Sequence, residues 1–113
     1  MSPGVTPDER GEPLSIASIT VTHEPDGAIL RRQQMQLASA ASRIVVDNAS
    51  AGAAQPELRE IIDAAGSELL SLPANIGLAA AINVGLRHVR ERHPTVQAIL
   101  LLDQDTEPGP TGL

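Results

Sequence analysis

The sequence contains an uninterrupted apolar run, VQAILLL at residues 96–102, which is followed directly by Asp103, Gln104 and Asp105. A strand with one solvated face alternates apolar and polar residues, whereas a strand covered on both faces does not need to alternate. Such strands belong mostly to parallel sheets, and parallel strands need crossover segments that are usually helices. The run therefore predicts an α/β fold, provided that the rest of the chain supplies strand–helix units.

The rest of the chain supplies those units in regular order. Strand-like segments occupy residues 14–22, 43–47, 67–72 and 96–102. Between them, helix-like patterns run over 28–42, from Pro56 to a capping Gly66, and from Leu78 to His93-Pro94, with Asp26 as a cap for the first. This alternation predicts a Rossmann-like, three-layer α/β/α fold with a parallel sheet in the order 3-2-1-4. On the apolar stripe of the third helix we place Leu78, Ile82, Leu86 and Val89.

The chain of 113 residues corresponds to one domain or to part of one. Residues 1–13 are rich in Pro and Gly and predict a flexible tail, and 14–113 form the domain. Four strands make about half of a doubly wound domain, so we expect a truncated fold.

Composition excludes several classes of function. The net charge of −6 argues against a nucleic-acid partner, and the absence of cysteine excludes disulfides and thiol chemistry. The sequence has neither a signal peptide nor an apolar segment long enough to span a membrane. We therefore expect a cytoplasmic location, either free or peripherally attached to the inner face of the membrane.

Polar residues follow each predicted strand. In order, they are Thr22-His23-Glu24, Asp47-Asn48, Asn75-Ile76-Gly77 and Asp103-Gln104-Asp105. Because the carboxyl ends of parallel strands share one edge, these groups are expected to converge there, around a crevice between strands one and four. His23 and Asp103 are expected to face each other across that crevice.

The carboxylates of this set have two readings. Asp103 and Asp105 could cap a turn, or both could bind one hard divalent cation. Asp47 could form an Asx turn with Asn48, or its carboxylate could accept a hydrogen bond from the imide N–H of a uracil or thymine. Both alternatives remain open for each residue on sequence grounds.

The remaining candidates are amides, a glycine and histidines. Asn75 suits a helix cap, Gly77 allows a ligand to approach the backbone, and Asn83 is unfavourable inside a helix unless it bonds something. His88 and His93, near a helix end, are expected to be exposed and to form no metal site with His23. The sequence has no Gly-x-Ser-x-Gly elbow and no glycine-rich phosphate loop.

Four stretches of the chain together resemble the family 2 glycosyltransferases, in particular their rhamnosyltransferase-like branch. They are ITVTHEPD (19–26), IVVDNAS (44–50), LPANIGLAAAINVGL (72–86) and ILLLDQDTEP (99–108). The resemblance implies the GT-A fold, with residues 14–113 as part of its nucleotide-sugar-binding domain. It also implies an inverting transfer of a sugar from a nucleoside diphosphate to an acceptor hydroxyl.

The resemblance implies roles for particular residues. Thr22, His23 and Glu24 would line the nucleotide end of the pocket, and Asp47 would contact the base. Asn75, Gly77 and Asn83 would shape the cleft wall, Asp103 would lie near the ribose or sugar, and Asp105 would bind Mg²⁺ or Mn²⁺. The expected partners are a donor such as dTDP-rhamnose or a UDP-sugar and a saccharide or lipid-linked acceptor.

Two departures from the family pattern bear on the base side of the pocket. Glu24 would add negative charge near a diphosphate unless it faces away, and Ala49 stands where the family commonly has glycine, which predicts turn strain. The family's general base is expected beyond Leu113. The alternatives are a sugar nucleotidyltransferase, which the lack of a glycine-rich loop disfavours, and a non-catalytic α/β nucleotide-binding or interaction module, a degenerate remnant of an enzyme.

Overall fold

Strands and helices alternate along the chain in the predicted order. The computed structural model describes residues 15–37 and 42–106, so the tail expected at 1–13 lies outside the described residues, as do 38–41 and 107–113. The elements are β1 (Ile16–Thr22), α1 (Gly27–Gln36), β2 (Ser42–Asp47), the short 3₁₀ helix η1 (Gly52–Ala54), α2 (Gln55–Ala65), β3 (Glu68–Ser71), α3 (Leu78–Arg92) and β4 (Ala98–Asp103).

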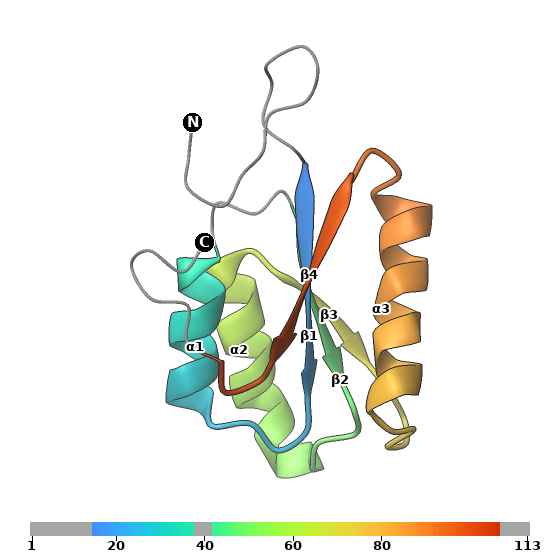
Figure 1. Cartoon of the computed structure of the whole chain (residues 1–113). Coiled ribbons are helices and arrows are strands. Elements are labelled where there is room, and N and C mark those ends of the chain that lie inside the picture. The colour runs from blue at the N-terminus through green and yellow to red at the C-terminus, as the bar shows by residue number, and fades with distance from the viewer. Residues whose placement is uncertain (1–14, 38–41, 107–113) are drawn as a thin grey trace.

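The four strands form one parallel sheet in the order β3-β2-β1-β4, which confirms the predicted order. Figure 1 shows α1 and α2 on one face of this sheet and α3 on the other. The chain therefore has the expected Rossmann-like, three-layer α/β/α architecture. Because β4 pairs with β1, the fourth strand returns beside the first, and the polar residues that follow these two strands come to the same edge.

The predicted helix boundaries are confirmed at three places. Asp26 caps α1 by accepting a hydrogen bond from the Ile29 N–H at 3.1 Å, and Pro56 lies in the first turn of α2. Gly66 ends α2 with φ at 72°, the left-handed conformation that glycine adopts without steric cost.

The first helix is shorter than predicted. Its expected range was 28–42, but α1 ends at Gln36, and Ser42 is the first residue of β2, where it pairs with Ala17 of β1. The segment ASAAS (38–42) contains small residues that fit a helix, so local propensity marks no end there. Pairing with β1 decides where the strand begins.

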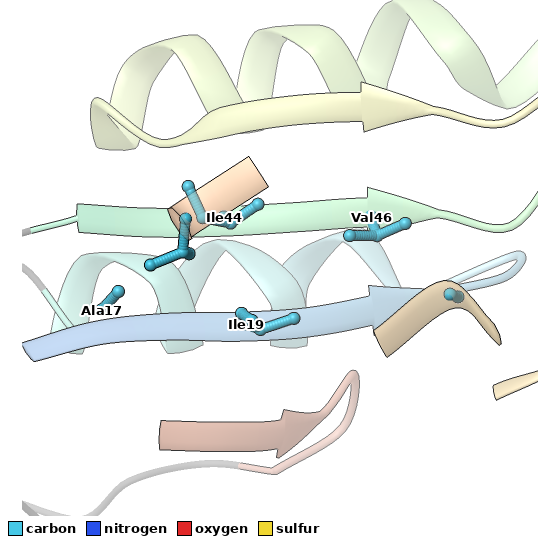
Figure 2. Close-up of a cluster of buried hydrophobic side chains, with 6 residues drawn as sticks. Ala17, Ile19, Ile44 and Val46 are labelled. Carbon is cyan, nitrogen blue, oxygen red and sulfur yellow. The ribbon is translucent and has the colours of Figure 1, made fainter. Parts of the chain in front are cut away.

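The sheet buries apolar side chains on both faces, in two clusters. Toward α3, Ala17 and Ile19 of β1 pack with Ile44 and Val46 of β2, and Figure 2 shows these four side chains next to one another on adjacent strands. Toward α1 and α2, Val45 packs with Leu30 of α1 and with three residues of α2: Leu58, Ile61 and Ile62. Both cores are aliphatic, as a chain without Phe, Trp or Tyr requires.

The buried face of α3 matches the predicted stripe only in part. Val89 is buried as predicted and Leu86 packs against the core, but the other buried positions are Ala81 and Gly85, and Leu78 is 58% exposed. A Cβ at position 85 would lie only 2.8 Å from Cγ2 of Ile19, so the helix packs close to the sheet through small residues. Close packing favours the face with small side chains, which a search for large apolar residues does not find.

The sequence predicted that the last strand is covered on both faces, and this prediction is wrong. Burial alternates along β4, and Ile99 and Leu101 are 38% and 52% exposed. The strand lies at the edge of the sheet, and α3 packs over β1 and β2 instead. An apolar surface therefore remains open beside α3.

Candidate functional site

The carboxyl ends of β1, β2 and β4 meet at one edge of the sheet (Figure 1). The strand registers align Thr22 with Asp47 and Val21 with Asp103. The polar residues after these strands are therefore neighbours in space, as the sequence predicts.

A hollow of about 170 Å³ opens at this edge, between β1, β4 and α3. Its position agrees with the crevice expected between the first and fourth strands. Among the described residues that line it, Asp103 is the one that is charged, and the others are largely aliphatic: Ile19, Val21, Leu78, Ile82, Leu101, Leu102 and Thr106. The described lining is thus an apolar surface with the Asp103 carboxylate at its end.

The turn that follows β4 is anchored by a buried glutamine. Gln33 of α1 is fully buried, and its Nε2 donates to the carbonyl oxygens of Asp103 at 2.7 Å and Thr106 at 2.9 Å. The backbone of the turn closes with a bond from the Thr106 N–H to the Asp103 carbonyl at 3.1 Å. Asp103 and Asp105 are both exposed. Gln33 therefore holds the backbone of the turn against α1, while both aspartates are exposed to solvent.

Gln33 is a residue that the sequence reasoning missed. It lies with Gln34 between Leu30 and Leu37, so the four residues have the i, i+3, i+4, i+7 spacing of a buried helix face. Gln34 is also fully buried, and its Nε2 donates to Thr20 Oγ1 at 3.3 Å. Two glutamines on the buried face of a helix could have identified these residues from the sequence, because buried amide groups need hydrogen-bond partners.

His23 contacts the β2 side of the edge instead of facing Asp103. Its Nδ1 lies 2.7 Å from the carbonyl oxygen of Asn48. From β4, it is Gln104 that reaches β1, because its Oε1 accepts a bond from the His23 N–H at 2.7 Å. The expectation that His23 faces Asp103 across the crevice is wrong, because the His23 ring bonds to the Asn48 carbonyl and His23 does not line the hollow.

Asp47 is fully buried, and its carboxylate is saturated with hydrogen bonds. Oδ1 accepts from Thr22 Oγ1 at 2.7 Å and from Ser50 Oγ at 2.6 Å, and Oδ2 accepts from the Ser50 N–H at 3.0 Å and from Gln55 Nε2 at 3.2 Å. Burial by itself raises the pKa of Asp47, but the bonds from Ser50, Thr22 and Gln55 outweigh it and hold the pKa below its ordinary value. In this arrangement Asp47 organises the loop after β2. A uracil or thymine base could bond to the Asp47 carboxylate only by displacing one of these donors.

Strained backbone in the loops after β1 and β2 supports this arrangement. Glu24, after β1, and Ala49, after β2, have positive φ angles of 48° and 60°, and the predicted strain at Ala49 is thereby confirmed. The Glu24 carboxylate accepts a bond from the Ala51 N–H, and the Glu24 N–H donates to Ser50 Oγ at 2.8 Å. The charge of Glu24 is therefore directed toward the loop after β2.

The loop before α3 is tied to the end of β2. The Asn48 side chain accepts from the Ile76 N–H at 2.9 Å and donates to the Gly77 carbonyl at 3.2 Å. Asn75 does not cap the helix: its Oδ1 accepts from the Gly77 N–H at 3.0 Å, and Gly77 is the N-cap, with φ at 86° and ψ at 166°. Asn83 is exposed on α3.

The other two histidines are partly buried at the opposite edge of the sheet, although we expected them to be exposed. His88 and His93 both bond to Glu68, the first residue of β3. Burial by itself raises the pKa of Glu68, but the bonds from His88 and His93 and their charge lower it below its ordinary value. These three residues lie outside the site predicted from the strand ends.

No protein-family model matches this chain, and no curated protein matches it either. The resemblance to family 2 glycosyltransferases therefore depends on the four quoted sequence stretches. Among the described residues, none of the helices has the length and hydropathy that crossing a membrane requires.

Proposed function

We propose that this domain binds the nucleoside diphosphate sugar of a family 2 glycosyltransferase. Its donor would be dTDP-rhamnose or a UDP-sugar, and the acceptor a saccharide or lipid-linked hydroxyl. The observation that carries the proposal is an apolar hollow with Asp103 at its end, at the carboxyl edge of a parallel sheet, with a second exposed aspartate, Asp105, in the turn that follows. Ligands of open α/β sheets bind at this edge, where the strand order reverses.

The carboxylates fit a hard divalent cation. Mg²⁺ and Mn²⁺ prefer oxygen ligands, and Asp103 and Asp105 offer exposed carboxylates from one short turn. Asp105 would hold the ion and Asp103 would lie beside the ribose or sugar. A bound divalent ion supplies stabilisation for the negative charge that develops on a diphosphate leaving group.

The other residues of the edge would hold the shape of the site. Gln33 fixes the backbone of the Asp103–Thr106 turn, and Gln104 links it to His23. Thr22 and Asp47 fix the loop after β2, so their contribution to the nucleotide would be made through loop geometry. Gly77 keeps side-chain atoms away from the start of α3, and Asn75, before the helix, and Asn83, in its second turn, are both exposed. A cytoplasmic location, where nucleotide sugars are made available, would suit this role.

Metal-dependent nucleotide binding tests the proposal. UDP and dTDP are titrated into the chain by calorimetry, with Mn²⁺ or with EDTA, using the wild type and Asp105→Asn. An interaction with a charged group contributes about 1.5–3 kcal/mol, so we expect Asp105→Asn to weaken binding about 10- to 150-fold in Mn²⁺ only.

The matched control is Asp63→Asn, which removes an exposed aspartate at the far end of α2 and should leave the affinity unchanged. Equal affinity with Mn²⁺ and with EDTA, or equal effects of the two substitutions, would contradict the proposal.

A non-catalytic interaction module is the second candidate. The exposed apolar residues of β4, Ile99 and Leu101, favour it, because an uncovered strand edge can pair with another chain. This candidate predicts no nucleotide binding under any metal condition, so the same titration separates the two.

A further inference from the structure

Three side chains that commonly bind metals converge at the amino-terminal edge of the sheet, away from Asp103 and Asp105. Glu68 begins β3, His88 lies in the last turns of α3, and His93 follows that helix. Glu68 Oε1 lies 2.9 Å from His88 Nε2, and Glu68 Oε2 lies 2.6 Å from His93 Nε2. One ligand atom from each of the three residues lies within 4.8 Å of the other two.

The fold holds these side chains in place. The His93 N–H donates to the Val89 carbonyl at 2.8 Å, which keeps His93 at the end of α3. Ser42 Oγ lies 3.1 Å from His93 Nδ1, so the other ring nitrogen is directed at Glu68. A partner on the second imidazole nitrogen is the arrangement that fixes tautomer and orientation in metal-binding histidines.

The spacing suits a tetrahedral ion. Two ligand atoms about 2.0–2.1 Å from a tetrahedral Zn²⁺ lie roughly 3.3–3.4 Å apart. The present N–O distances of 2.9 and 2.6 Å are shorter than this by about 0.4–0.8 Å, so the side chains would have to move apart by that much for an ion to replace the shared protons. The proton of each neutral imidazole would then reside on Nδ1, where that of His93 can be donated to Ser42 Oγ.

Two imidazoles and one carboxylate select zinc and related first-row ions over Mg²⁺, which prefers oxygen. Solvent can reach the cluster, since the side chains of His88, His93 and Glu68 are 18%, 27% and 40% exposed. His93 also lines an open hollow of about 340 Å³, together with Arg90 and Gln97. A fourth coordination position could therefore be filled by water or by a small anionic ligand.

We propose that Glu68, His88 and His93 form a three-ligand site for Zn²⁺, distinct from the carboxylates of Asp103 and Asp105 at the carboxyl edge of the sheet. The site ties the start of β3 to the end of α3, so an ion bound there would stabilise the contact between these two elements. The proposal is independent of the proposed glycosyltransferase function.

Cobalt is the probe for this site, because tetrahedral Co²⁺ absorbs visible light far more strongly than octahedral Co²⁺. The full chain is titrated with Co²⁺ and then with Zn²⁺, which should displace it. We expect one tetrahedral Co²⁺ per chain in the wild type. His88→Gln and His93→Gln should each weaken binding more than about 100-fold, beyond the 10- to 100-fold that loss of an outer-shell partner costs.

The matched controls are His23→Gln, which removes the third histidine of the chain, and Asp63→Asn, which removes an exposed aspartate of α2; both should bind Co²⁺ as the wild type does. Circular dichroism checks that the variants fold, and Zn²⁺ should raise the Tm of the wild type and not that of Glu68→Gln. Binding that survives in both His88→Gln and His93→Gln, or that is lost in either control, would overturn the proposal, as would an octahedral spectrum in the wild type.

Discussion

The buried carboxylate of Asp47 makes the loop after β2 sensitive to acid. Its pKa in the folded chain lies below the ordinary value of 3.8, so its stabilising contribution is complete above that value. The contribution is lost as the pH falls through the folded-state pKa. Asp47→Asn should lower the free energy of unfolding by about 1–3 kcal/mol at neutral pH, because it leaves buried donors without an acceptor.

Urea unfolding between pH 7 and pH 3 measures this effect. The difference between wild type and Asp47→Asn should shrink toward the acid end of the range. A difference that stays constant with pH would show that the charge of Asp47 has no part in stability.

Ala49 stores strain that glycine would release. Its φ of 60° costs about 1–2 kcal/mol for a residue with a Cβ, whereas glycine costs about 0.4–1 kcal/mol through the entropy of the unfolded chain. Ala49→Gly should therefore stabilise the fold by up to about 1.5 kcal/mol in thermal or urea unfolding. Ala54→Gly is the control: Ala54 has right-handed backbone angles, so the same change there should destabilise.

At the level of elements, the fit of α3 on the sheet depends on Gly85. Alanine is favoured over glycine by about 1 kcal/mol in a helix interior, yet its Cβ would lie 2.8 Å from Ile19 Cγ2 and 3.3 Å from Val46 Cγ2. Overpacking of this kind costs about 1–3 kcal/mol, so Gly85→Ala should lower the Tm despite its better propensity.

Gly52→Ala is the matched control for Gly85→Ala, because a Cβ at position 52 would meet no atom within 4 Å. Its Tm should stay close to that of the wild type. A rise in Tm for Gly85→Ala would mean that α3 does not pack as closely as described.

The ends and faces of the elements were predicted unevenly. The helix caps at Asp26 and Gly66 could be predicted from the sequence because they depend on local chemistry. The early end of α1 could not, since it depends on the pairing of Ser42 with β1. The small-residue face of α3 could not be predicted either, since it depends on the distance between that helix and Ile19.

At the level of the whole molecule, β4 is an edge strand with apolar side chains open to solvent, and this predicts self-association. Leu101 is 52% exposed, and an edge strand that is apolar from residue 98 to 102 can pair with another chain. Leu101→Lys should make the chain more monomeric in sedimentation velocity over a concentration series. Met35→Lys is the control, because Met35 is equally exposed but lies on α1, away from the edge. A wild-type chain that is monomeric at all concentrations would contradict this prediction.

The α/β class, the strand order and the set of polar residues at the carboxyl edge could all be predicted from the sequence, because strand–helix alternation and right-handed crossovers leave few topologies. What those polar residues do depends on contacts that form only in the folded chain. Asp47 is enclosed by donors that arrive from Thr22, Ser50 and Gln55, while Asp103 and Asp105 stay exposed because Gln33 holds their backbone from α1. The cluster of Glu68, His88 and His93 was hidden for the same reason: its members come from separate elements, and hydrogen bonds between elements depend on distances in space that sequence spacing does not encode.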